Sequence, residues 1–303
     1  MDRIRIRGGQ PLNGTIEISG AKNSALKLMA ASLLTDGELI LSRSPRLADS
    51  RFLGQLLAHM GVEVEEQAGS RLRMHAAKIS DPFAPYDLVR KMRASFNVLG
   101  PLIAREGKAR VSLPGGCAIG ARPVNLHLEA LEALGAQIVL EEGYVHATAP
   151  KGGLHGGRVV FPFVSVGATE HAMLAAVLAK GETVLENCAR EPEIADLAGC
   201  LNAMGAKVEG AGEAVIRIQG VDRLNGTEWA VVPDRIETGT YAIAAAAAGG
   251  NVLLKDAIED HNQALWRAMR LAGVEIEAEA GGVRIRRSGP IKPVDIQTEP
   301  FPG

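Results

Sequence analysis

Residues 56–66, LLAHMGVEVEE, hold the pattern that decides the fold: an apolar helical run, a turn at Gly61 and a strand-like alternation with period two. The pattern returns three times, as LEALGAQIVLE (131–141), LNAMGAKVEG (201–210) and MRLAGVEIEAE (269–279). Successive turn glycines are 74, 70 and 68 residues apart; they are Gly61, Gly135, Gly205 and Gly273. Each stands where a helix ends in a residue with positive φ, so we predict four copies of one helix–turn–strand unit.

Alanine-rich helices precede three of these patterns, and each stops at a glycine before another strand. The segments are AASLLTDGELIL (30–41), AAVLAKGETVLE (175–186) and AAAAAGGNVLLK (244–255). A helix that is apolar on all sides belongs in a core, whereas the strands are apolar on one face only. The sequence therefore predicts an α/β fold, an inside-out α/β barrel of repeated helix–strand units with helices inside and sheets outside. A solenoid of stacked helix pairs is the alternative, and the strand signals weigh against it.

Domain organisation follows from length and from loop signals. A chain of 303 residues exceeds what one hydrophobic core usually supports, so we expect two domains. The stretches PFVSVGAT (162–169) and VVPDRIETGT (231–240) each place a proline and a loop before a new helix, which predicts a repeat start. The N-terminal sequence predicts a β-hairpin that turns at Asn13–Gly14, within RIRIRGGQPLNGTIEISG (3–20).

Composition narrows the classes of function. The chain carries 33 Lys and Arg against 35 Asp and Glu, a formal charge of −2, which argues against nucleic acid as the main partner. Its longest apolar stretch, residues 241–248, is far shorter than the roughly 20 residues of a membrane-spanning helix. The first ten residues lack the apolar region of a signal peptide, so we expect a cytoplasmic protein without a membrane partner.

Three cysteines fit free thiols in a reducing compartment better than a disulfide framework. Cys188 and Cys200 lie in apolar runs and are expected in the core, whereas Cys117 lies in the glycine-rich loop LPGGCAIGARPVNLHLEAL (113–131). Such a loop does not pack into a core, and a thiol near Lys22, Arg93 or Arg122 would have a lowered pKa and could act as nucleophile or proton donor. An inert loop cysteine is the alternative interpretation.

Three further loops could bind anions. Lys22 and Asn23 open an amphipathic helix in SGAKNSALKL (19–28), Arg93 belongs to a basic cluster before a helix in RKMRASFNVLGPL (90–102), and Ser165 to Gly167 open the helix of FVSVGATEHAM (163–173). Backbone amides and cations at helix N-termini suit phosphates. The alternatives are solvated lysines and arginines and an ordinary N-cap at Ser165. The seven histidines have no metal-ligand spacing, so no metal site is expected.

The strings ISGAKNSAL, LPGGCAIGARPVNLH, MRASFNVLGPL and PDRIETGTY resemble the UDP-N-acetylglucosamine 1-carboxyvinyltransferases, a family of enolpyruvyl transferases. The resemblance runs from Met1 to Gly303 and is most specific in the cysteine loop. It implies a pair of inside-out barrels, with residues 22–230 forming the first. Residues 1–21 and 231–303 would belong to a second, incomplete one.

The resemblance also implies the reaction: transfer of the enolpyruvyl group of phosphoenolpyruvate to the 3-hydroxyl of UDP-N-acetylglucosamine, the first committed step of peptidoglycan synthesis. Cys117 would protonate the methylene carbon of phosphoenolpyruvate and react with fosfomycin, and Lys22 and Arg122 would hold the phosphate. No cofactor is implied, and the oligomeric state is open. The nucleotide sugar would be bound by Asn23, Arg93, Pro123, Val124, Asn125, Leu126, Ser165, Val166 and Gly167.

Departures from the family pattern are also visible. The family has an acidic residue where this chain has Asn125, and some members have a lysine where it has Phe163. The family continues for roughly two more repeats beyond Gly303, and its general-base aspartate and carboxylate-binding arginines lie there. This leads to the hypothesis of a fragment or truncated gene product, with a catalytically impaired binding protein as the alternative function. The related shikimate-pathway transferase is a further alternative, but it uses no catalytic cysteine.

Overall fold

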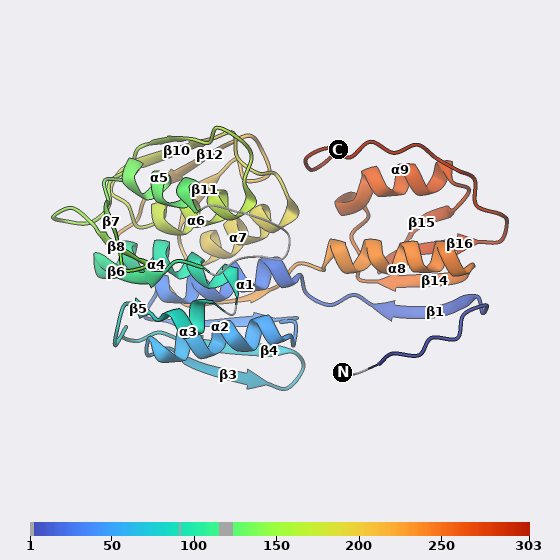
Figure 1. Cartoon of the computed structure of the whole chain (residues 1–303), viewed down its shortest axis with the longest axis horizontal. Helices are drawn as coiled ribbons and strands as arrows, with labels where there is room; N and C mark the ends of the chain where they lie inside the picture. Colours follow the sequence, from blue (N-terminus) through green and yellow to red (C-terminus); the bar gives the residue numbers. More distant parts are fainter. Residues whose placement is uncertain (1–2, 91, 115–123) are drawn as a thin grey trace. The chain divides into compact units, whose positions relative to one another are not determined.

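The computed structural model describes residues 3–90, 92–114 and 124–303 (Figure 1). The chain divides into two compact units, unit 1 with residues 1–21 and 233–303 and unit 2 with residues 22–232.

Unit 2 contains three four-stranded sheets built on one plan. In each sheet the first two strands are parallel and the other pairings are antiparallel. The strand orders are β13(Thr227–Ala230)-β2(Glu38–Ser42)-β4(Arg71–His75)-β3(Glu63–Gln67), β5(Phe83–Ala84)-β6(Lys108–Ser112)-β8(Tyr144–Thr148)-β7(Gln137–Glu141) and β9(Arg158–Val160)-β10(Glu182–Glu186)-β12(Val215–Gln219)-β11(Lys207–Glu209). Because β13 ends the unit but pairs with β2 near its start, the third repeat supplies the strand that completes the first sheet.

The helices of unit 2 fill the space that the sheets enclose (Figure 1). They are α1(Lys22–Ala31) with η1(Ser32–Leu34), α2(Ala48–His59), α3(Tyr86–Val89), η2(Arg93–Val98), α4(Leu99–Glu106), α5(Asn125–Ala133), α6(Val166–Ala176) and α7(Pro192–Ala203). Residues 24–31 of α1 and 168–176 of α6 are buried on all sides. The helices are therefore inside and the sheets outside, as the small-residue pattern predicts.

Unit 1 contains one sheet and two helices. The sheet has the order β1(Leu12–Glu17)-β14(Gly250–Lys255)-β16(Gly282–Arg287)-β15(Glu275–Glu279). Helices α8(Arg235–Ala248) and α9(Gln263–Leu271), with η3(Glu259–Asn262) before α9, pack on its apolar face around the fully buried Trp266. The order of pairings matches that of each sheet in unit 2, so this is a fourth copy of the repeat.

Local signals predict most element ends correctly. The four turn glycines have φ angles of 97°, 90°, 103° and 91°, which confirms the predicted helix ends. The prediction of an N-terminal hairpin is wrong, because Asn13 and Gly14 lie inside β1, which pairs in parallel with β14. Asn13 uses its side-chain oxygen to accept a hydrogen bond from the Asn251 amide, so a residue typical of turns instead joins two strands.

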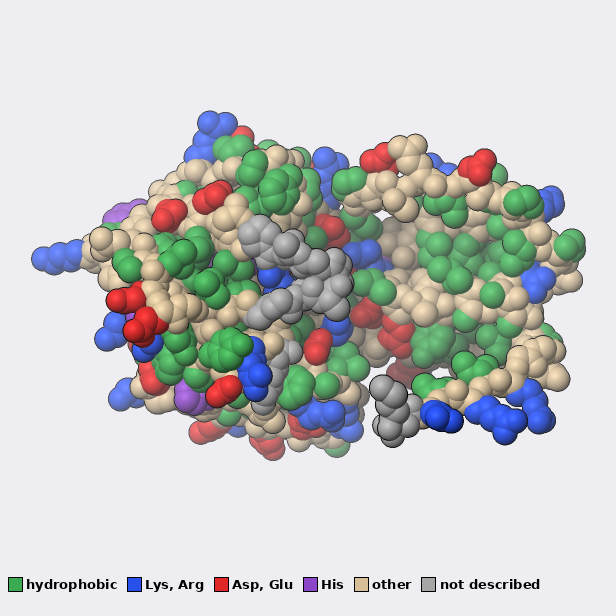
Figure 2. All heavy atoms as spheres, in the orientation of Figure 1, with side chains coloured by type: hydrophobic (Ala, Val, Ile, Leu, Met, Phe, Trp, Pro, Cys, Tyr) green, Lys and Arg blue, Asp and Glu red, His purple; other side chains and the backbone are tan. Residues whose placement is uncertain are grey.

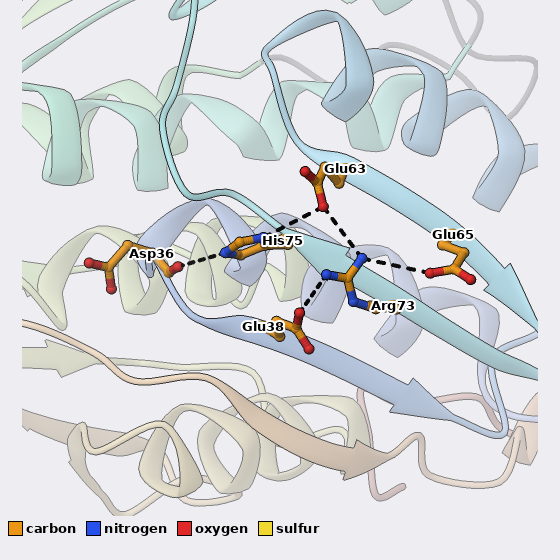
Figure 3. A network of polar contacts seen from close by, with 6 residues as sticks. All are labelled: Asp36, Glu38, Glu63, Glu65, Arg73 and His75. Atoms are coloured by element: carbon orange, nitrogen blue, oxygen red, sulfur yellow. Dashed lines mark hydrogen bonds and ion pairs between the residues drawn. The ribbon is translucent and has the colours of Figure 1, made fainter.

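The outer face of the first sheet of unit 2 carries a network of charged residues (Figure 3). Arg73 on β4 pairs with Glu38 on β2 and lies 3.4 Å from Glu63 on β3. The hydrogen bond from Arg73 lowers the pKa of the Glu38 carboxyl. His75 lies 3.6 Å from the same Glu63 carboxylate. On the face shown in Figure 2, acidic and basic side chains are interspersed in this way.

A buried ion pair joins two of the inner helices. Lys27 of α1 lies 2.6 Å from Glu170 of α6, and their side chains are 9% and 0% exposed. Burial raises the pKa of Glu170, and the neighbouring Lys27 ammonium opposes that rise. The free-energy cost of removing both charges from water offsets most of their electrostatic attraction, so the pair adds little net stability. Replacing only one partner is destabilising, because it leaves the other charge buried without a counter-charge.

We therefore expect Lys27→Met to destabilise unit 2 by about 3–5 kcal/mol, because it leaves Glu170 buried without a counter-charge. The double variant Lys27→Met/Glu170→Met should recover to within about 1 kcal/mol of the parent. Urea unfolding of the parent, both single variants and the double variant measures this coupling. A double variant as unstable as the worse single variant would contradict it.

Candidate functional site: helix N-termini of unit 2

Helix α1, the short helix η2 and helix α6 begin in the loops that the sequence predicts to bind anions. Lys22 is the first residue of α1, and its ammonium lies 3.4 Å from the carboxylate of Asp49 in the first turn of α2. Ser165 is the N-cap of α6 and accepts a hydrogen bond from the Ala168 amide, so the N-cap interpretation of this residue is correct. An N-cap and an anion site do not exclude each other, because the first turn has several free amides.

Contacts between side chains connect these helix starts. The Lys27–Glu170 pair links α1 to α6, and Lys27 also donates to the Asn23 carbonyl at 3.4 Å. His127, in the first turn of α5, packs against Gly167, where a Cβ atom would come within 3.4 Å of the imidazole. A Cβ atom at position 167 would thus be in van der Waals contact with His127, which leaves no room there for a larger side chain without a shift of the imidazole.

The other predicted residues are placed as follows. Arg93 begins η2, Val124 precedes α5 as its N-cap, Asn125 donates to Glu129 at 3.2 Å, and Leu126 is buried. Asn23 is half-buried in the first turn of α1, and Val166 begins α6. Cys117, Arg122 and Pro123 lie outside the described residues, so their predicted roles stay predictions.

Two imidazoles lie beneath these helix starts. The Gly100 amide donates to Nε2 of His171 at 2.7 Å, so the proton of the neutral ring is on Nδ1. The His127 ring centroid is 5.0 Å from that of His171, and Phe96 packs edge-on to His127. Burial lowers the pKa of His171 to about 3, and burial with the charges of Arg93 and Lys27 nearby holds the pKa of His127 well below its ordinary value. Both rings are therefore neutral near pH 7.

Sequence reasoning missed a buried carboxylate behind the start of α1. Asp196 of α7 accepts hydrogen bonds from the Ser24 hydroxyl, from Nε1 of Trp229 at 2.8 Å and from the Val232 amide at 3.3 Å. Burial raises the pKa of Asp196, and these donors oppose the rise. The carboxylate thus fixes the first turn of α1 to α7 and to the end of unit 2. Nothing in the local sequence of Asp196 indicates these three distant partners.

The arrangement suits an anionic ligand. Helix N-termini carry partial positive charge, and the cationic side chains of Lys22, which is paired with Asp49, and Arg93 lie at the starts of α1 and η2. The neutral imidazoles add no charge. No group of three or more His, Cys, Asp or Glu side chains within residues 3–90, 92–114 and 124–303 is placed to hold a metal ion. In the same ranges, no helix is long and apolar enough to cross a bilayer.

Solved structures with this architecture are enolpyruvyl transferases. The chain is similar to the enolpyruvyl transferase NikO from Streptomyces tendae, with a TM-score of 0.80 and 21% identity over 97% of this chain and 70% of that one. It is also similar to EPSP synthase from Acinetobacter baumannii, with a TM-score of 0.73 and 21% identity over 96% of this chain and 68% of that one. The fold is therefore the enolpyruvyl transferase fold.

Sequence comparison gives the family. The sequence model of EPSP synthase (3-phosphoshikimate 1-carboxyvinyltransferase) matches residues 6–303. UDP-N-acetylglucosamine 1-carboxyvinyltransferases from Maricaulis maris and Caulobacter vibrioides are 69% and 63% identical over 100% of this chain and 72% and 71% of their own lengths. The chain belongs to the EPSP synthase family and, within it, to the UDP-N-acetylglucosamine 1-carboxyvinyltransferases, which confirms the resemblance.

The buried histidine makes stability depend on pH. Because the pKa of His171 is lowered in the folded state, the unfolded chain takes up a proton below about pH 6.5 that the folded chain takes up only near pH 3. Stability is thus fully present above pH 6.5 and falls with decreasing pH. From His171 we expect a loss of about 2 kcal/mol by pH 5. His171→Gln, whose side-chain oxygen can still accept from Gly100, should flatten the dependence by that amount in urea unfolding at pH 5 and pH 8.

His155→Gln, at an exposed position, is the matched control for the replacement of a histidine by glutamine. Equal slopes in the parent and His171→Gln would show that His171 titrates normally in the folded protein.

The buried thiols should resist alkylation. Cys188 and Cys200 are 1% and 0% exposed, as the sequence predicts, and burial raises the pKa of each to about 12. A folded Cys117→Ala variant treated with iodoacetamide at pH 8 should therefore gain no label, whereas the unfolded variant should gain two. Mass spectrometry counts the labels, and rapid labelling of the folded variant would contradict the burial of these thiols.

Proposed function

We propose that this chain transfers the enolpyruvyl group of phosphoenolpyruvate to the 3-hydroxyl of UDP-N-acetylglucosamine, the first committed step of peptidoglycan synthesis. The observation that carries this proposal is the identity of 69% and 63% to two UDP-N-acetylglucosamine 1-carboxyvinyltransferases over the entire chain. We further propose a cytoplasmic enzyme that, through its product, supports cell shape and division.

In the proposed reaction the oxygen of the sugar 3-hydroxyl forms a bond to C2 of phosphoenolpyruvate and Cys117 gives a proton to C3. The hydroxyl proton passes to a general base, which the resemblance places beyond Gly303. A proton then leaves C3 for the Cys117 thiolate while the bond from C2 to the phosphate oxygen breaks, which restores the double bond and regenerates the thiol. A thiol suits this step when nearby cations bring its pKa towards neutrality. Lys22 and Arg122 would stabilise the phosphate as it leaves, because fixed cations stabilise charge that develops in the transition state.

The described residues support the rest of the site. Lys22 is held beside Asp49 at 3.4 Å, so it stands at the start of α1 as part of an ion pair. The diphosphate of the nucleotide sugar would lie at the N-terminus of α6, at Ser165, Val166 and Gly167, where amides point outward. Asn23, Arg93 and the run from Pro123 to Leu126 would hold the sugar and the uracil. Because Asn125 carries no charge, its contact to the base would be a neutral hydrogen bond.

Phosphate release from phosphoenolpyruvate in the presence of UDP-N-acetylglucosamine tests the proposal. The chain, and a chimaera that continues past Gly303 with the C-terminal remainder of the Maricaulis maris relative, are each compared with their Cys117→Ala variants. We expect release that Cys117→Ala reduces by at least a hundredfold, because general acid catalysis contributes about 10²–10⁴-fold. Cys188→Ala is the matched control and should keep full activity.

Fosfomycin provides a second readout. It should label the parent once and the Cys117→Ala variant not at all. Phosphate release that survives Cys117→Ala would remove Cys117 from the mechanism. No release by either chain, together with tight binding of UDP-N-acetylglucosamine, would favour the alternative of a nucleotide-sugar binding protein.

A further inference from the structure

A cavity of about 320 Å³ in unit 2 is lined by residues of helix α2 and of the hairpin β3–β4. Figure 1 shows the position of these elements. Gly54 and Ala58 of α2 form one wall, and Val64 of β3 and Leu72 of β4 form the other. Helix α2 has small residues on this side, and a Cβ atom on Gly54 would be in van der Waals contact with the Val64 side chain, 3.4 Å away. The volume is in the range that holds a small organic molecule.

Positively charged residues outnumber negatively charged ones at this cavity. Arg46, Arg51, Arg71 and Glu66 line it. Arg71 is neutralised, because its guanidinium binds both carboxylate oxygens of Glu228. Arg46 donates to the Gln67 carbonyl at 3.2 Å, which leaves its charge uncompensated. Arg51 is exposed, and none of the described residues provides a partner for its guanidinium. Two uncompensated arginines against one glutamate leave one excess positive charge.

We propose that this cavity is a second ligand site, which takes a compact apolar monocarboxylate: one aromatic or branched aliphatic group with a single carboxylate. The apolar walls formed by Ala58, Val64 and Leu72 suit the hydrocarbon part. The planar guanidinium of Arg51 suits a carboxylate, which it can bind through two parallel hydrogen bonds. One excess positive charge matches one carboxylate.

The same turn of α2 connects the cavity to Lys22. Ser50 and Arg51 line the cavity, while the adjacent Asp49 lies 3.4 Å from the Lys22 ammonium. The Ser50 hydroxyl donates to the Pro45 carbonyl at 2.7 Å and accepts from the Leu47 amide at 3.3 Å, so this turn and the preceding loop form one hydrogen-bonded piece. We expect a ligand in the cavity to shift this turn and, through Asp49, to alter its ion pair with Lys22. This regulatory consequence rests on the proposed function, whereas the ligand site does not.

Titration calorimetry with 2-naphthoate tests the site, and 2-naphthamide is the neutral comparison ligand. We expect one saturable site for 2-naphthoate and at least tenfold weaker binding of the amide. Arg51→Gln should weaken 2-naphthoate binding about tenfold, and Ala58→Trp should abolish it by filling the cavity. Circular dichroism checks that each variant is folded.

Matched controls use exposed positions elsewhere in unit 2. Arg217→Gln removes an arginine from the outer side of β12, and Ala203→Trp adds an indole at the end of α7; both should bind 2-naphthoate as the parent does. Equal affinity for the acid and the amide, unchanged binding by Ala58→Trp, or no saturable binding at millimolar concentration would each overturn the proposal.

The regulatory consequence has its own readout. Saturating 2-naphthoate should change the dissociation constant of UDP-N-acetylglucosamine several-fold, and Asp49→Asn should remove that change. An unchanged constant in the parent overturns the coupling and leaves the proposed function intact. Absence of any nucleotide-sugar binding overturns the proposed function and the coupling with it, whereas the ligand site is decided by the 2-naphthoate titration alone.

Discussion

Close packing of helices against one another in the middle of unit 2 is the constraint on which the rest of the structure depends. A helix buried on every side must have small or apolar residues all round, and α1 and α6 meet this requirement over residues 24–31 and 168–176. Because the helices occupy the centre, each sheet packs one face against the helices and exposes the other face to solvent. Their outer faces can then carry charges such as those of Arg73 and Glu38, which are partly exposed and paired with each other.

The same constraint explains why the candidate site lies at one end of these helices. Helices that pack side by side in the core and start at the same end have their first turns close together. The free backbone amides of those turns are then also close together. Polar side chains below that end must be paired, as Lys27 and Glu170 are, or neutral, as His127 and His171 are. Charge inside unit 2 is therefore held in pairs, whereas the helix ends keep their partial positive charge. An anion would accordingly be attracted to these ends and not into the core.

Periodicity in the sequence predicts the repeats, the inside-out arrangement and the turn glycines, because each of these is encoded within a few residues. Contacts between residues that are far apart in the sequence are not encoded in such short segments. Asn13–Gly14 is typical of a turn, yet its partner strand β14 lies more than 200 residues further on, so the local signal misled. Asp196 likewise depends on Ser24 and Trp229, which only the fold brings to it. The roles of Cys117 and Arg122 derive from the resemblance alone. The glycines around these residues allow many backbone conformations, so the sequence does not predict where the two side chains lie.

The two tryptophans give each unit its own optical probe. Trp229 lies in unit 2, where its indole N–H donates to the Asp196 carboxylate, and Trp266 lies in unit 1, where it donates to the Glu259 carbonyl at 2.8 Å. One indole thus senses a nearby negative charge and the other a neutral backbone group. Their emission maxima should differ, and replacing either residue with phenylalanine would leave a fluorescence signal that reports on a single unit.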